Sequence, residues 1–228
     1  MKKYLFFLLV LGLIVFTACS DDPVEEIIID NVFVDIIQTD ARSTEYLIVI
    51  HGSGLVGAPQ LVIESNVTLV PGEDANTYEG LYNFDTPGDA YPFNLVVNGE
   101  IVEANVRIPY HVFITNTISS TWNGKTNQLL MWSTADKDGT EANNGALRNQ
   151  NQFLEIYWSP ENLGQGYFIE KLANNTARTR ELKDLLPEGW VDAEIYITNT
   201  NTVKQNGIEF RAESLDSRFV TNPSNPPA

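Results

Sequence analysis

Residues 93–108 read Phe-Asn-Leu-Val-Val-Asn-Gly-Glu-Ile-Val-Glu-Ala-Asn-Val-Arg-Ile, two apolar runs joined by Asn98-Gly99. Asparagine followed by glycine is the strongest short signal for a two-residue hairpin turn, because both residues accept a positive φ. Alternating apolar and polar side chains are typical of strands with one buried face. This stretch therefore predicts a β-hairpin whose strands are Phe93–Val97 and Ile101–Ile108.

The rest of the chain repeats this pattern of short apolar runs separated by Gly, Pro, Asn and Asp. We predict further strands at residues 27–37, 46–50, 60–63, 77–82, 112–117, 128–133, 153–158, 167–172, 193–199 and 208–212. Strands at this spacing, with turn residues between them, are typical of a β-sandwich. The sequence thus predicts an all-β fold.

Pro109 separates two sets of predicted strands, so we expect two tandem β-sandwich domains, residues 27–108 and residues 109–220. A long polar loop occupies residues 134–151 of the second domain. Residues 221–228 carry three prolines and no apolar run, which predicts a disordered tail.

Both regions resemble known β-sandwich families. Tyr46–Leu55, Asp85–Gly88 and Phe93–Gly99 resemble an IPT/TIG-type immunoglobulin-like domain, where a strand ends in Gly-Ser-Gly and a later Pro-Gly turn feeds a hairpin. The second region is similar to fibronectin type III modules, with Trp132 at the end of an early strand and Leu185–Trp190 placed like that family's corner. These resemblances imply two tandem immunoglobulin-like domains.

The N-terminus has the features of a secretory signal. Lys2 and Lys3 precede thirteen uncharged residues, from Tyr4 to Phe16. This run is too short to span a bilayer, which takes about 20 residues. Cys19, the only cysteine of the chain, follows Thr17-Ala18, where a signal peptidase would cut.

This N-terminus resembles the lipobox of bacterial lipoproteins, in which the cysteine becomes the lipidated first residue of the mature protein. The resemblance implies a signal peptide at residues 1–18, lipidation of Cys19, a tether at residues 19–26 and attachment to the membrane through the lipid alone. Ser20-Asp21-Asp22 resembles the acidic export signals of surface lipoproteins in one Gram-negative phylum, which implies the outer membrane and the cell surface. The alternatives are a plain polar tether on the periplasmic face, or an ordinary secreted protein with a free cysteine.

The charge of the chain disfavours nucleic acid as a partner. The whole sequence has 14 basic and 30 acidic residues, a net charge of −16, and loss of Lys2 and Lys3 with the signal would make it −18. Such a surface repels phosphate backbones. With Cys19 lipidated no disulfide is available, so the fold depends on a packed core.

No motif in the sequence predicts catalysis. His51-Gly52-Ser53-Gly54 looks like the oxyanion loop of an α/β-hydrolase, but no Gly-x-Ser-x-Gly follows and the only other histidine is His111. A strand followed by a glycine turn explains that segment. Neither a zinc cluster nor a phosphate-binding loop is present. The 30 carboxylates leave a glycosidase pair open as an alternative, although no particular pair can be chosen.

Two sets of residues are candidate ligand sites. Asp136, Asp138 and Glu141 could form a calcium loop, although glycine stands at the fourth position and the sequence favours a plain acidic turn. No other cofactor is expected. Exposed aromatic rings stack on sugars, and Trp122, with Asn123 beside it, and Trp190 occur in polar turn sequences.

These observations lead to the expectation of a membrane-anchored lipoprotein that is not an enzyme. It would act as a binding or adhesion module for a glycan or for a protein partner of the cell envelope. The alternatives are a structural subunit of an envelope complex, in which the aromatics are core residues, and a hydrolase with an unrecognised carboxylate pair.

Overall fold

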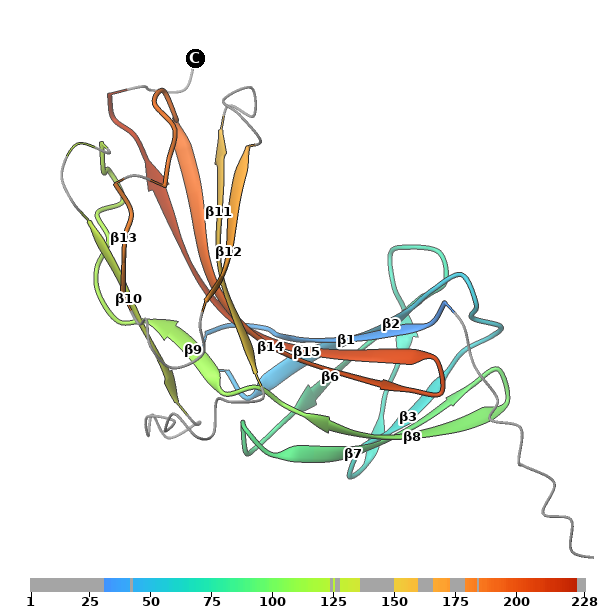
Figure 1. The fold of residues 1–228 in the computed structure, drawn as a ribbon. Coiled ribbons are helices and arrows are strands. Elements are labelled where there is room, and N and C mark those ends of the chain that lie inside the picture. The colour runs from blue at the N-terminus through green and yellow to red at the C-terminus, as the bar shows by residue number, and fades with distance from the viewer. Residues whose placement is uncertain are drawn as a thin grey trace, which may run out of the picture.

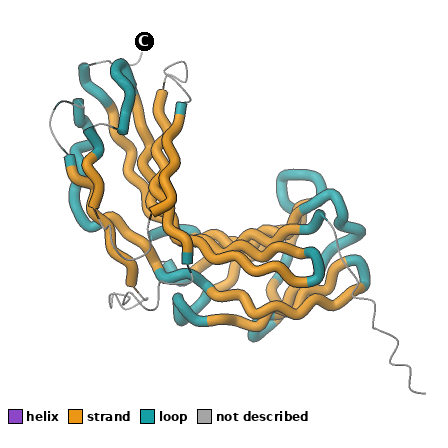
Figure 2. Tube along the Cα trace, in the orientation of Figure 1, coloured by secondary structure: helices purple, strands orange, loops and turns teal. Residues whose placement is uncertain are grey.

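The computed structural model describes residues 31–41, 43–123, 125, 128–135, 150–159, 166–172, 179–183 and 185–224. Across these residues the fold is all-β, with fifteen strands and no helix, as predicted (Figures 1 and 2). Three sheets contain these strands.

Eight strands form one continuous sheet that runs through the whole molecule. In spatial order they are β12 (Tyr167–Leu172), β11 (Asn151–Ser159), β14 (Asp192–Gln205), β15 (Ile208–Thr221), β1 (Phe33–Gln38), β2 (Glu45–His51), β6 (Thr77–Asn83) and β5 (Val70–Pro71). All neighbours are antiparallel except β1 and β15, which run parallel with Asp35 opposite Arg211. The first and last described strands therefore lie side by side in the middle of the sheet.

Two smaller sheets cover parts of one face of this large sheet. The four-stranded one is ordered β4 (Asn66–Val67), β3 (Gln60–Val62), β7 (Ala90–Val97) and β8 (Glu100–Arg107). The three-stranded one is ordered β13 (Thr179–Glu181), β10 (Leu129–Ala135) and β9 (His111–Ile114). Figure 1 shows a bent molecule with these two sheets on the outer side of the bend.

The long β14–β15 hairpin joins the two arms of the bend. Each of its strands has 14 residues, which at about 3.4 Å per residue span roughly 45 Å. Its turn is Asn206-Gly207, with φ values of 49° and 83°. The predicted Asn98-Gly99 turn has the same conformation, with φ values of 56° and 86°, and joins β7 to β8 as expected.

The four-stranded sheet and the facing part of the large sheet enclose the core of the first lobe. Phe93 lies at its centre, with ring centroids 6.1 Å from Phe84 and 6.0 Å from Phe210. Phe210 belongs to β15, and Ile208 and Ala212 of the same strand are also fully buried in this core. Residues of the long β14–β15 hairpin thus complete a lobe that otherwise consists of residues 32–108.

The three-stranded sheet and the other half of the large sheet enclose the core of the second lobe. Leu154, Ile156, Ile195 and Ile197 alternate inward from β11 and β14, as their strand spacing predicts. Trp132 of β10 is also buried here. Residues 109–220 therefore supply all of the second core and part of the first.

Side chains of the long hairpin fix the passage of the chain between the two lobes. The backbone N–H of Val112 donates to Ser214 Oγ at 3.1 Å, and that of Ile114 donates to Asp216 Oδ2 at 2.7 Å. Asn199 Nδ2 donates to the carbonyl of Tyr110 at 3.0 Å. β9 is not hydrogen-bonded to β15 in a sheet. These side-chain bonds therefore satisfy backbone groups of β9 and of Tyr110, which precedes it.

The structure corrects the bounds of two predicted irregular segments, the tail at residues 221–228 and the loop at residues 134–151. The tail does not begin at residue 221, because Thr221 ends β15 and Asn222 is buried, with its Nδ2 donating to the carbonyl of Trp190 at 3.0 Å. Residues 225–228 lie outside the described residues. Within the predicted loop at 134–151, Thr134 and Ala135 belong to β10 and Asn151 begins β11, and residues 136–149 lie outside the described residues.

Candidate functional site

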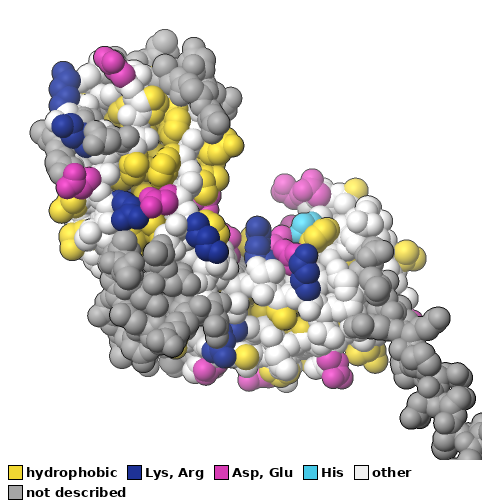
Figure 3. All heavy atoms as spheres, in the orientation of Figure 1, with side chains coloured by type: hydrophobic (Ala, Val, Ile, Leu, Met, Phe, Trp, Pro, Cys, Tyr) yellow, Lys and Arg dark blue, Asp and Glu magenta, His cyan; other side chains and the backbone are white. Residues whose placement is uncertain are grey.

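The uncovered face of the eight-stranded sheet lies on the inner side of the bend, and we call it the open face. Opposite residues of neighbouring strands form rows across it. At one end the row is Tyr167, Tyr157, Glu194 and Phe219, and at the other end it is Glu209, Phe33, His51 and Thr77. Figure 3 shows apolar and charged side chains gathered inside the bend.

Large apolar side chains are concentrated on this open face. Eleven are exposed in the described residues, and seven of them belong to it: Phe33, Val70, Leu81, Tyr157, Tyr167, Ile169 and Phe219. Single exposed apolar residues are ordinary on a protein surface, whereas a shared position on one face marks an interaction site.

Three tyrosines form a cluster at the second-lobe end of the open face. The ring centroid of Tyr157 lies 6.3 Å from that of Tyr167, with the rings tilted by 35°. It lies 5.9 Å from that of Tyr196, with the rings nearly perpendicular. Both distances fall in the range in which aromatic rings attract each other, so each ring supports the next.

Two glutamates fix the hydroxyl ends of this cluster. Tyr157 donates to Glu155 Oε2 at 2.7 Å, and Tyr196 donates to Glu194 Oε2 at 2.6 Å. Each carboxylate stabilises the protonated phenol, which raises the pKa of Tyr157 to about 12 and the pKa of Tyr196 to about 12. At neutral pH both hydroxyls therefore keep their protons and stay bound to the carboxylates.

Three hollows follow one another along the open face. The outermost measures about 280 Å³ and includes Phe219, Tyr157 and Glu194. The middle one, about 530 Å³, shares Tyr157 and Glu194 with it and extends to Arg211, and we call it the tyrosine hollow. The third, about 260 Å³, shares Arg211 and includes His51. Their shared residues make one shallow groove that crosses from the second lobe to the first.

The first-lobe end of this groove carries an ion-pair network. Asp35 accepts hydrogen bonds from His51 Nε2 at 2.7 Å and from Arg211 Nε at 3.0 Å. These residues come from β2, β1 and β15, three neighbouring strands of the large sheet. No serine or cysteine is among the described residues that line this hollow. His51 therefore has a carboxylate partner here but no adjacent nucleophile, and the hydrolase-like segment is an antiparallel strand followed by a glycine turn.

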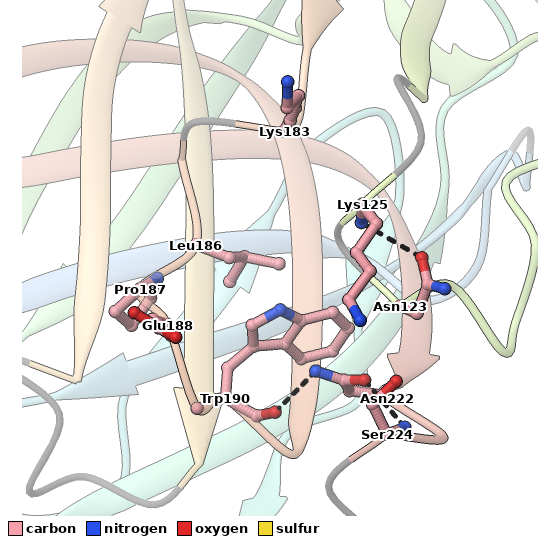
Figure 4. Close-up of a pocket in the computed structure, with 10 residues that line it drawn as sticks. Asn123, Lys125, Lys183, Leu186, Pro187, Glu188, Trp190, Asn222 and Ser224 are labelled. Carbon is pink, nitrogen blue, oxygen red and sulfur yellow. Dashed lines mark hydrogen bonds between the residues drawn. The ribbon is translucent and has the colours of Figure 1, made fainter.

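A separate pocket of about 620 Å³ lies at the far end of the second lobe (Figure 4). Its lining includes Trp190 and Asn123, so two of the predicted contact residues do come together here. In Figure 4, Lys125 extends beside the indole of Trp190, and Lys183 lies apart from it at the rim. Asn123 Oδ1 accepts a hydrogen bond from the backbone N–H of Lys125 at 3.0 Å.

The prediction that Trp122 and Trp190 are exposed is wrong. They are only 2% and 3% exposed, and their ring centroids lie 6.0 Å apart inside the second core. A ring in that position offers no free face to a sugar, so its polar sequence neighbours misled the prediction. Asn123 is half-buried at the edge of this tryptophan pair.

The other predicted site residues lie outside the described residues: Cys19, and the candidate calcium ligands Asp136, Asp138 and Glu141. Among the residues that the structure places, no group of three or more His, Cys, Asp or Glu side chains could hold a metal ion. A search of the same residues finds no helix of the length and hydrophobicity needed to cross a bilayer.

The sequence analysis missed the tyrosine cluster, although a signal for part of it was present. Phe153, Glu155 and Tyr157 alternate with buried residues along the predicted strand 153–158, and this alternation could have placed all three on one exposed face. No family model matches the chain, and no curated protein matches it.

Proposed function

We propose that this protein is a lipid-anchored binding module that holds an extended glycan on the open face of its large sheet. The observation that carries the proposal is the position of Tyr157, Tyr167 and Phe219. They are exposed together beside Glu155 and Glu194, at one end of a groove that crosses both lobes. Aromatic rings can stack on the apolar faces of sugars, and carboxylates can accept hydrogen bonds from sugar hydroxyls.

The fold suits this role because the open face is broad and rigid. Each row of side chains stands on hydrogen-bonded strands, and the long hairpin ties the two lobes together. A preorganised surface loses little entropy when it binds. We infer that the lobes are two immunoglobulin-like sandwiches that share one sheet, with the first lobe nearer the anchor.

The anchor is part of the proposal and has its own test. We propose that Cys19 carries the lipid, that the protein is attached to the outer membrane, and that Ser20-Asp21-Asp22 directs it to the cell surface. A Cys19→Ser variant should leave the membrane fraction, and protease added to intact cells should digest the wild-type protein. A variant that stays in the membrane fraction would refute the lipid anchor.

Binding is tested with a glycan array, using the full chain purified in detergent. We expect binding to a defined subset of glycans, with the bound glycans recovered intact after incubation. Release of shortened sugars would instead favour the carboxylate-based hydrolase, because Glu155, Glu194 and Glu213 line a single hollow. A protein that binds no glycan at all would contradict the glycan as ligand.

The second candidate is a structural subunit of an envelope complex. The exposed side chains of Phe33 and Leu81, at the first-lobe end of the same face, favour it because neither adjoins the tyrosine cluster. On this alternative the protein should migrate in a stable, larger assembly when outer membranes are solubilised gently. A monodisperse monomer under those conditions would count against it.

A further inference from the structure

The tyrosine hollow offers a ligand aromatic faces and negative charge. It is lined by Tyr157 and Tyr196, and by three glutamates, Glu155, Glu194 and Glu213. Tyr167 packs against Tyr157 at its edge and is itself 45% exposed. The faces of aromatic rings carry partial negative charge, so rings and carboxylates attract the same kind of group.

The one cation among the described residues that line the hollow is already paired. Arg211 lines it, but the guanidinium Nε of Arg211 donates to Asp35 Oδ1 at 3.0 Å, on the side of the neighbouring hollow. Arg211 also attracts Glu213, but Asp35 balances its charge, and neither Glu155 nor Glu194 forms an ion pair with any described lining residue. A bound cation would supply the missing charge.

The hydroxyl donors of the hollow are also engaged. The hydroxyls of Tyr157 and Tyr196 donate to Glu155 and Glu194. The hydroxyl of Thr198 lies 3.4 Å from Glu155 Oε1, to which it donates. Each carboxylate still has lone pairs, whereas among the described lining residues the terminal N–H groups of Arg211 are the side-chain donors that remain for a ligand oxygen. The site is therefore complementary to a ligand group that is a donor, not to one that is an acceptor.

We propose that the tyrosine hollow binds a protonated amine of the ligand, so that the glycans this protein prefers carry amino sugars with free amino groups. An ammonium group satisfies all three features, because it is positive, donates three hydrogen bonds and attracts aromatic faces. This inference rests on the proposed glycan-binding function and specifies the chemistry of its ligand.

The test compares two sugars that differ only at the amine. A hexamer of β-1,4-linked glucosamine and its fully N-acetylated counterpart are titrated calorimetrically into the full chain in detergent, in mildly acidic buffer. We expect the free amine to bind at least tenfold more tightly, and this advantage to shrink as salt is added.

Matched variants connect that preference to the hollow. Glu194→Gln keeps the shape but removes a charge, so it should reduce the advantage of the glucosamine hexamer by at least threefold. Glu103→Gln, on the exposed side of β8, removes the same charge elsewhere and should leave the advantage unchanged. Equal effects of the two variants would mean that net charge alone attracts the amine, which overturns the proposal.

The two proposals can fail separately. Equal or tighter binding of the acetylated hexamer, with array binding that is lost in Tyr157→Ala, would overturn the amine preference and leave glycan binding in place. Failure of both hexamers and of every arrayed glycan to bind would overturn both proposals.

Discussion

Ser214 Oγ donates a hydrogen bond to Gln38 Oε1 at 2.7 Å, between residues 176 positions apart in the sequence. The same hydroxyl accepts the backbone N–H of Val112 at 3.1 Å. One buried side chain of β15 thus connects the end of β1 to the strand with which the chain enters the second lobe. The bend that creates the open face depends on contacts of this kind.

Replacing Ser214 with alanine should destabilise the protein by about 1–3 kcal/mol, because a buried N–H and a buried amide oxygen lose their partner. The measurement is urea unfolding followed by circular dichroism. Ser217→Ala, at an exposed position of the same strand, is the matched control and should change stability by less than about 0.5 kcal/mol. Equal effects of the two substitutions would show that the junction does not depend on Ser214.

Phe210→Ala should destabilise the first lobe, although the residue lies near the C-terminus. The side chain is fully buried against Phe93, so its removal should cost about 3–5 kcal/mol. Phe219→Ala is the control, because that ring is 57% exposed on the same strand. Amide hydrogen exchange should increase in β7 and β8 for Phe210→Ala only. Unchanged protection there would mean that the first lobe folds without β15.

Glu213→Gln should stabilise the protein at neutral pH. Burial raises the pKa of Glu213 above its usual value of 4.5, and Arg211 opposes that effect. The folded protein therefore binds this proton more tightly than the unfolded chain does, and the ionised side chain is unfavourable at neutral pH. The stability difference between the two proteins should shrink as the pH falls through the raised pKa and vanish below 4.5.

Urea midpoints measured across this pH range check the prediction. A wild-type protein that is more stable than Glu213→Gln at neutral pH would show that the attraction of Arg211 outweighs the burial. Glu209→Gln serves as a control, because that carboxylate occupies the same face of β15 and pairs with Lys204 at 2.9 Å.

Trp190→Phe should leave ligand affinity within about twofold of the wild type while it lowers the melting temperature. The indole is 3% exposed in the second core, so the change affects packing and not a contact surface. Thermal unfolding and titration with a glycan identified on the array measure the two effects. A large loss of affinity with no change in melting temperature would show that Trp190 contacts the ligand.

Local patterns in the sequence predicted the strands well, because alternation and turn chemistry are local properties. Asn98-Gly99 predicted its hairpin, and Asn206-Gly207 carries the same turn signal directly before the predicted strand 208–212. Applied to Asn206-Gly207, the Asn-Gly hairpin rule would have extended the predicted strand 193–199 as far as that turn. The parallel pairing of β1 with β15 left no such signal, because the two strands are far apart in the sequence.

The candidate site was less predictable because it depends on contacts between residues that are far apart in the sequence. Trp122 and Trp190 occur among polar turn residues, and their burial depends on their contact with each other. The tyrosines were visible as strand residues, but only the tertiary arrangement decides which face of a sheet is left uncovered. The alternation along a strand shows which of its residues point outward. It does not show that β12, β11 and β14 bring their tyrosines together on the same face.

The account depends most on the tyrosines of the open face, and titration of an array-identified glycan into Tyr157 variants tests them most directly. Tyr157→Phe keeps the ring and should retain affinity within about threefold, whereas Tyr157→Ala should lose tenfold or more, which is about 1.4 kcal/mol. Asn123→Ala, in the tryptophan-lined pocket, should bind like the wild type. Unchanged affinity in Tyr157→Ala, or a comparable loss in Asn123→Ala, would contradict the open face as the binding surface.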